Sequence, residues 1–148
     1  MSRALNDAQR RDWLRLARAE NVGPVTFREL VARYGEPADA LAALPDLARR
    51  GGRGATLSIP TAAQAEDELA AGEALGARLI CACEPEFPRA LAALDPPPPL
   101  IWARGNAHLL AREAVALVGA RVASAAGQRF ARGLAAELGG AGRVVVSG

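Results

Sequence analysis

Residues 115–148 constrain the fold more than any other segment; they read VALVGARVASAAGQRFARGLAAELGGAGRVVVSG. Two short apolar runs, each stopped by a glycine, flank a helical pattern in which Phe130, Leu134 and Leu138 recur at i, i+4 and i+8. We expect Phe130 in the core and Gly133 at a close approach of the helix to a sheet. A strand, a glycine turn, a helix and a second strand predict a right-handed βαβ unit.

Two further apolar runs precede this unit, ARLICAC after Gly76 and LIWARG before Asn106. Continuous apolar runs of this length are typical of strands that are covered on both faces of a parallel sheet. The sequence therefore predicts an α/β fold with an incomplete Rossmann-like parallel-sheet domain over residues 76–148. Three or four strands with about two helices cannot cover such a sheet, so we expect the chain to be a truncated part of a longer protein.

Residues 1–75 have the pattern of short helices joined by tight turns. Gly35 is placed to end a helix, and Pro37 and Pro45 are each placed to open a further short one. We predict a small helical domain, residues 1–75, ahead of the Rossmann-like domain. Three pairs of residues have the spacing of a capping box at a helix start: Asn6 with Gln9, Thr26 with Glu29, and Thr61 with Gln64.

The composition excludes several classes of protein. With 51% hydrophobic and 23% charged residues, the chain of 148 residues is expected to form a core rather than stay disordered. No apolar segment approaches the roughly 20 residues that span a bilayer, and the N-terminus lacks the apolar centre of a secretory signal, so we expect a cytoplasmic protein. Cys81 and Cys83 do not have the spacing of a metal site or a disulfide framework, and we expect both to be buried on one face of a strand.

The net charge of +2 is too small to indicate a nucleic-acid partner by itself, so a phosphate-binding surface must be a local cluster. Such a cluster is predicted where Arg121 stands in place of the second glycine of a dinucleotide-binding fingerprint. Gly119 supplies the turn, and Arg121 can reach a phosphate with its own side chain. Ser124 and Gly127 follow at the start of the helix, where unpaired N–H groups and the positive end of the helix dipole favour an anion.

The end of the second strand, Ser147 and Gly148, should lie beside this turn, because the carboxyl ends of parallel strands meet at one edge of a sheet. Two loops that are compatible with phosphate would then face one crevice. From the residues alone a structural alternative stays open, in which Gly119 is an ordinary turn, Ser124 only caps the helix and Arg121 is a solvated side chain.

The same residues resemble a known family. Residues 115–148 closely resemble the Rossmann-like core of the DNA-processing protein A family (DprA, also called Smf), which runs as an apolar strand, G-[SA]-R, a serine, a glycine, an amphipathic helix and a V-x-S-G strand end. Upstream, EPEFPRALAALDPPPPLIWARGN is similar to the segment that leads into that core. NVGPVTFRELVARYG is similar to the family's helical, sterile-alpha-motif-like N-terminal domain.

The resemblance implies a binding protein rather than an enzyme, without a cofactor and without membrane association. The family binds single-stranded DNA in the cytoplasm during natural transformation (competence), protects it and helps load the recombinase RecA. Family members continue with further strands that contribute DNA contacts and a dimer surface, so the resemblance also implies a homodimer for the full-length protein. The DNA-binding or phosphate-binding residues that it implies are Gly119, Arg121, Ser124, Gly127, Ser147 and Gly148.

Other interpretations stay open. The NVGP turn is similar to a helix-hairpin-helix element, but a simple helix-connecting turn is preferred because Gly-Pro pairs commonly mark turns. Arg49, Arg50 and Arg53 form either a secondary phosphate contact or a solvated loop. The alternative function is a Rossmann-like enzyme that hydrolyses nucleoside monophosphates, and a third is a helical interaction module without a ligand. No catalytic constellation is visible, since His108 lacks a nearby thiol or carboxylate.

Overall fold

The structure is a computed structural model that describes residues 3–50 and 57–148. The chain divides into two compact units, residues 1–105 and residues 106–148. The domain boundary that the sequence predicts, between residues 75 and 76, falls inside the first unit and stays a prediction.

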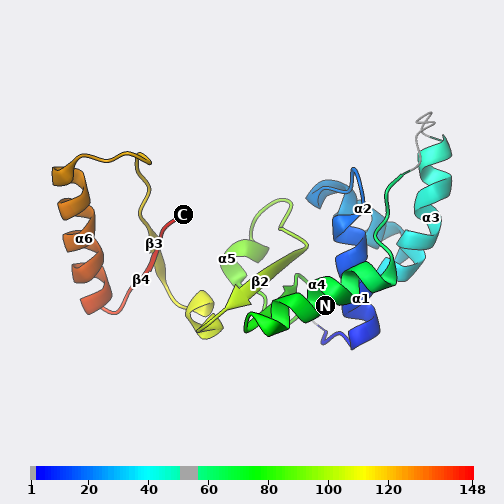
Figure 1. Cartoon of the computed structure of the whole chain (residues 1–148), viewed down its shortest axis with the longest axis horizontal. Coiled ribbons are helices and arrows are strands. Elements are labelled where there is room, and N and C mark those ends of the chain that lie inside the picture. Colours follow the sequence, from blue (N-terminus) through cyan, green and yellow to red (C-terminus); the bar gives the residue numbers. More distant parts are fainter. Residues whose placement is uncertain (1–2, 51–56) are drawn as a thin grey trace. The chain divides into compact units, whose positions relative to one another are not determined.

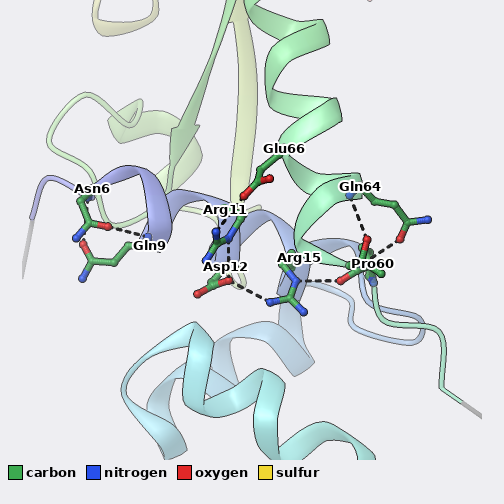
Figure 2. Close-up of polar contacts among 9 residues, drawn as sticks. Asn6, Gln9, Arg11, Asp12, Arg15, Pro60, Gln64 and Glu66 are labelled. Atoms are coloured by element: carbon green, nitrogen blue, oxygen red, sulfur yellow. Dashed lines mark hydrogen bonds and ion pairs between the residues drawn. The ribbon is translucent and has the colours of Figure 1, made fainter.

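In the described part of the first unit, the helices α1 to α4 precede the strands (Figure 1). Two of the predicted capping boxes are confirmed: Asn6 with Gln9 starts α1, and Thr61 with Gln64 starts α4 (Figure 2). The helices are α1 (Asp7–Arg18), α2 (Pro24–Tyr34), α3 (Pro37–Arg50) and α4 (Ala62–Ala74). Gly35 ends α2 with φ of 81°, in the left-handed region that glycine tolerates, as the sequence predicts.

Two details of the predicted helices are wrong. The second helix begins at Pro24 with Gly23 as its cap, so Thr26 lies inside the helix rather than capping it. Proline at the first helical position is already set to the helical φ, and this starts the helix three residues early. The third helix continues through Pro45, which is exposed, while Leu44 beside it is buried in the core.

The core of this unit is formed mainly by α1, α2 and α3. Leu14 and Leu16 of α1 have no exposed surface, and Trp13 and Phe27 pack with ring centroids 5.1 Å apart at an interplanar angle of 52°. The indole Nε1 of Trp13 donates a hydrogen bond to the carbonyl oxygen of Pro99 at 2.6 Å. The Pro-rich segment that follows α5 (Arg89–Ala92) is therefore attached to the helices.

A hydrogen bond joins α1 to the segment that leads into α4, and an ion pair joins α1 to α4 itself. The Asp12 carboxylate accepts from Arg15 at 3.2 Å, Arg15 donates in turn to the carbonyl oxygen of Pro60, and Arg11 pairs with Glu66 (Figure 2). These groups lie at or near the surface, so each pair contributes little to stability and mainly fixes how the two helices cross.

The strands β1 (Ala77–Cys81) and β2 (Leu100–Arg104) pair antiparallel, with Ala77 opposite Arg104. The expectation that all apolar runs belong to one parallel sheet is thus wrong for this pair. A continuous apolar run reports that a strand is covered on both faces, and here the helical core covers the face with Leu79 and Cys81, while Ile80 on the opposite face is buried as well. The strand ends at Cys81, so Cys83 is half-buried in the following turn rather than on the same strand face.

Trp102 of β2 lies directly on α4. A Cβ atom built on Gly72 of α4 would overlap the Trp102 ring, closer than any real contact. The indole Nε1 of Trp102 donates to Glu68 at 3.2 Å, and the hydrogen bonds from Arg18 and then from Trp102 hold the pKa of Glu68 below its ordinary value. Gly72 is therefore the residue that allows the β1–β2 strand pair to pack on this helix.

We expect Gly72→Ala to lower the free energy of unfolding by about 1–2 kcal/mol. Alanine gains about 1 kcal/mol in helix propensity, but overpacking against the indole costs up to about 3 kcal/mol. Urea denaturation followed by circular dichroism, which reports the helices of both units, measures the difference. Gly133→Ala on α6 is the control, because a Cβ there meets nothing within 4 Å and the propensity gain should stand alone. An unchanged or raised stability of Gly72→Ala would contradict the close packing of Trp102.

The second unit consists of the short 3₁₀ helix η1 (Ala107–Ala111), β3 (Ala114–Ala116), α6 (Ala125–Gly140) and β4 (Val144–Val146). The strands β3 and β4 pair in parallel, with Val115 opposite Val145. The βαβ arrangement of strand, helix and parallel strand is therefore confirmed. With the helical region before it, the chain is α/β, and its parallel-sheet part is an incomplete Rossmann-like fold.

Phe130 is 72% exposed rather than in the core, and Gly133 faces open space rather than a sheet. The reason is the small size of the sheet, whose two paired strands have three residues each. Leu134 and Leu138 on the same side of α6 are only half-buried. Every residue of 106–148 is described, and none of them is fully buried.

Candidate functional site

The carboxyl ends of β3 and β4 lie at one edge of the parallel pair. Ala116 is opposite Val146, and the backbone N–H of Leu117 donates to the carbonyl oxygen of Val146 at 2.9 Å. The loop that contains Gly119 and Arg121 leaves β3 at this edge, where Ser147 and Gly148 leave β4. The two chain segments that the sequence analysis singles out therefore depart from the same side of the sheet.

Ser124 caps α6. Its Oγ accepts the backbone N–H of Gly127 at 3.2 Å, and its carbonyl oxygen accepts the N–H of Gln128 at 2.9 Å. The Gln128 side chain donates back to the carbonyl oxygen of Ala123 at 3.1 Å, which ties the loop to the helix. Only the first two amides of the helix, at residues 125 and 126, then lack an intrahelical or capping partner by the usual geometry. The tip of α6 can thus still donate two hydrogen bonds to an anion.

The two predicted glycines leave the backbone uncovered without being required by the local fold. A Cβ on Gly119 would meet no atom within 4 Å, and Gly119 does not have a left-handed φ. A Cβ on Gly127 would lie 3.4 Å from the Ser124 Oγ, which is ordinary contact. Neither packing nor backbone strain among the described residues explains glycine at these positions.

Arg121 is exposed, and among residues 3–50 and 57–148 its guanidinium has no carboxylate partner and no hydrogen bond to protein. Two of the other four arginines of the second unit are engaged within the protein: Arg143 pairs with Glu113, and Arg112 donates to the carbonyl oxygen of Gly142 at 2.7 Å. The Arg121 guanidinium is therefore available to a ligand.

The two units differ in charge. Residues 106–148 hold five arginines and two glutamates, a formal charge of 5 − 2 = +3, whereas residues 1–105 hold thirteen arginines and fourteen acidic residues, 13 − 14 = −1. The positive charge of the chain is thus concentrated in the unit that carries the predicted phosphate loops. Because the total charge of the chain is low, a phosphate-binding surface needs a local excess of positive charge, and the second unit has such an excess.

In the described part of the chain, the histidine, cysteine and acidic side chains form no metal-binding group. Burial raises the pKa of the Cys81 thiol well above its usual range, so this thiol is protonated and unreactive at neutral pH. His108 is exposed on η1. Within residues 3–50 and 57–148, no group of three His, Cys, Asp or Glu side chains could hold a metal ion, and no helix is both long and apolar enough to cross a membrane.

The remaining predicted contacts lie in the first unit. Arg49 pairs with Asp46 within α3, and Arg53 lies outside the described residues. In the turn between α1 and α2, Asn21 has a φ of 60° and Gly23 caps α2 without a side-chain hydrogen bond. The first amides of α2 are therefore not covered by a capping side chain.

Fold and site together define an α/β protein that has a helical region followed by a Rossmann-like unit with a basic, open carboxyl edge. Two family models match this chain: the DprA-like N-terminal HHH domain over residues 7–71, and the DNA recombination-mediator protein A over residues 78–148. The chain belongs to the DprA family. No curated protein matches the chain.

The matches bear on two of the open interpretations. The first family model names an HHH domain, so it favours the helix-hairpin-helix interpretation of the NVGP turn over a simple connecting turn. The second names a recombination mediator, which assigns the chain to DNA processing and recombination and gives no support to the hydrolysis of nucleoside monophosphates.

Proposed function

We propose that this protein binds single-stranded DNA without chemical turnover, protects DNA taken up during natural transformation, and helps load RecA onto it in the cytoplasm. The proposed contacts are Gly119, Arg121, Ser124, Gly127, Ser147 and Gly148. Membership of a recombination-mediator family supports the DNA part of this proposal. The helical domain of residues 1–75, the Rossmann-like domain of residues 76–148 and a homodimer of the full-length protein belong to the same proposal.

The observation that carries the proposal is the exposed guanidinium of Arg121, which lies in the loop between β3 and α6 and has no protein partner among the described residues. A dinucleotide site holds one pyrophosphate against bare backbone, and an arginine side chain would obstruct that approach. A strand of nucleic acid instead presents successive phosphates, which suit a projecting guanidinium beside free helix amides. Arg121 and the tip of α6 supply this combination.

We expect Arg121→Ala to weaken binding of a fluorescent oligothymidylate by about 1–3 kcal/mol, or roughly 5- to 150-fold in Kd, because the substitution removes one charge-assisted hydrogen bond to a phosphate. The plot of log K against log salt should also become shallower by about 0.7 for each single-strand phosphate that is no longer neutralised. Fluorescence anisotropy over a salt titration measures both quantities.

Arg89→Ala is the matched control, because Arg89 is an exposed arginine of the first unit on the short helix α5. Equal binding by Arg121→Ala and the unmodified protein would refute the role of this loop. Release of free base from nucleoside monophosphates would instead favour the enzyme alternative. The RecA part is tested separately, by whether the protein accelerates assembly of RecA on the same oligonucleotide.

A further inference from the structure

A second pair of arginines lies on α6. Arg129 and Arg132 are three residues apart, which places them about 60° apart around the helix and about 4.5 Å apart along its axis. Both are exposed. They lie on the face of α6 nearly opposite to Leu134 and Leu138, the half-buried side of the helix. Both guanidinium groups therefore project to solvent rather than toward the sheet.

Neither of these arginines has an acidic partner. The only carboxylate on α6 is Glu137, which is eight residues from Arg129 and five from Arg132, outside the three- and four-residue spacings that bring helical side chains together. Like charges three residues apart repel each other and weaken a helix slightly. Among residues 3–50 and 57–148, neither guanidinium takes part in an ion pair.

The first unit treats its arginines differently. Eight of its arginines are paired with carboxylates: Arg3, Arg10, Arg11, Arg15, Arg18, Arg28, Arg49 and Arg78. In that unit arginine serves mainly to hold helices and loops together. The three exposed arginines of the second unit that lack a protein partner, Arg121, Arg129 and Arg132, all belong to the β3–α6 segment.

We infer that Arg129 and Arg132 form a second phosphate contact, which continues the site of Arg121 along the exposed face of α6. This inference rests on the proposed function and assigns two further residues to it. When a single strand binds at the start of α6, its next phosphates come to lie beside the guanidinium groups of Arg129 and Arg132 on the exposed face of the helix. The repulsion between the two guanidinium groups is relieved when each of them lies beside a phosphate of the strand. The ligand is the sugar-phosphate backbone, so binding along this face is independent of base sequence.

The test is a salt titration of oligothymidylate binding by the Arg129→Ala/Arg132→Ala variant. Without these two guanidinium groups, two fewer phosphates are neutralised, and the slope of log K against log salt should fall by about 1.4. Both positions are exposed on a helix and alanine is the strongest helix former, so the variant is expected to fold; circular dichroism checks this. The lysine double variant Arg129→Lys/Arg132→Lys keeps both charges and should keep the slope. The charge-matched control is Arg33→Ala/Arg89→Ala, two exposed arginines of the first unit.

Each outcome decides between the two proposals. A shallower slope in the alanine pair alone supports the contact along α6. An unchanged slope in that pair, together with weaker binding by Arg121→Ala, overturns the contact along α6 and leaves the proposed function intact. An equal reduction in the control pair also overturns it, because the effect is then one of net charge. If the unmodified protein shows no salt-dependent binding at all, the proposed function itself fails.

Discussion

Replacing Trp13 with alanine is expected to lower the free energy of unfolding by about 3–5 kcal/mol, the range for removing a large aromatic side chain from a core. Trp13 is only 4% exposed and packs against Phe27 at 5.1 Å between ring centroids. Its Nε1 donor also satisfies the carbonyl oxygen of Pro99 at 2.6 Å. One substitution thus removes the packing of α1 on α2 at this point and leaves a backbone acceptor without its partner.

Urea denaturation followed by circular dichroism measures this change. Trp13→Phe separates the two contributions, because it retains most of the apolar area and deletes only the donor; we expect it to cost about 1–3 kcal/mol. Val25→Ala is the control, since Val25 is 48% exposed on α2 and its truncation should change stability by no more than about 0.5 kcal/mol. A destabilisation below about 1 kcal/mol for Trp13→Ala would mean that this indole is not part of the core.

The second large effect is expected for Arg10→Ala, with a destabilisation of about 3 kcal/mol. Glu84 is a buried carboxylate at 8% exposure; its Oε2 accepts the N–H of Cys81 at 2.8 Å, and its Oε1 is paired with Arg10. Removing one partner of a buried ion pair leaves a charge without compensation, which costs about 3–5 kcal/mol. The lower end applies because the Arg10 side chain is 32% exposed and water screens the pair.

The adjacent Arg11 is a close control. It pairs with Glu66 and Asp12 at the surface, so Arg11→Ala should cost no more than about 1 kcal/mol. The double variant Arg10→Met/Glu84→Gln should recover part of the stability, because it buries no charge and keeps an acceptor for the N–H of Cys81. Equal destabilisation by Arg10→Ala and Arg11→Ala would show that burial of Glu84 does not set the cost. Chemical denaturation of the four proteins measures these differences.

Local signals in the sequence predict the helix starts at Asn6 and Thr61, because a capping box depends on residues only three positions apart. The direction of the β1–β2 pair could not be predicted in the same way. An apolar run indicates that both faces of a strand are covered, and the same run is compatible with a parallel sheet or with an antiparallel pair that packs on helices. The prediction for Thr26 failed where two local signals compete, since Pro24 starts the helix first.

The part of the candidate site that belongs to the G-x-R motif and the serine after it, residues 119–124, could be predicted from the sequence. The G-x-R motif and the serine that follows predict a loop between a strand and a helix start, and in the structure Arg121 lies in the loop between β3 and α6 while Ser124 caps α6; their binding of phosphate stays a prediction. Whether Arg121 forms an ion pair within the protein depends on side chains that are distant in the sequence, so the sequence alone could not predict that its guanidinium is unpaired among the described residues. Arg129 and Arg132 lie outside the motif, although their lack of acidic neighbours three or four positions away could have been noted from the sequence.

The packing of Trp102 on Gly72 has a practical consequence for dissecting the protein. A recombinant fragment that stops at residue 75 would lack the β1–β2 strand pair. It would therefore lose Trp102, which covers α4, and the Pro99 carbonyl that accepts the hydrogen bond of Trp13. Such a fragment would expose apolar surface and tend to aggregate. A fragment that extends to Gly105, where φ is +84°, keeps both tryptophans in place and is the natural length for studying the helical part alone.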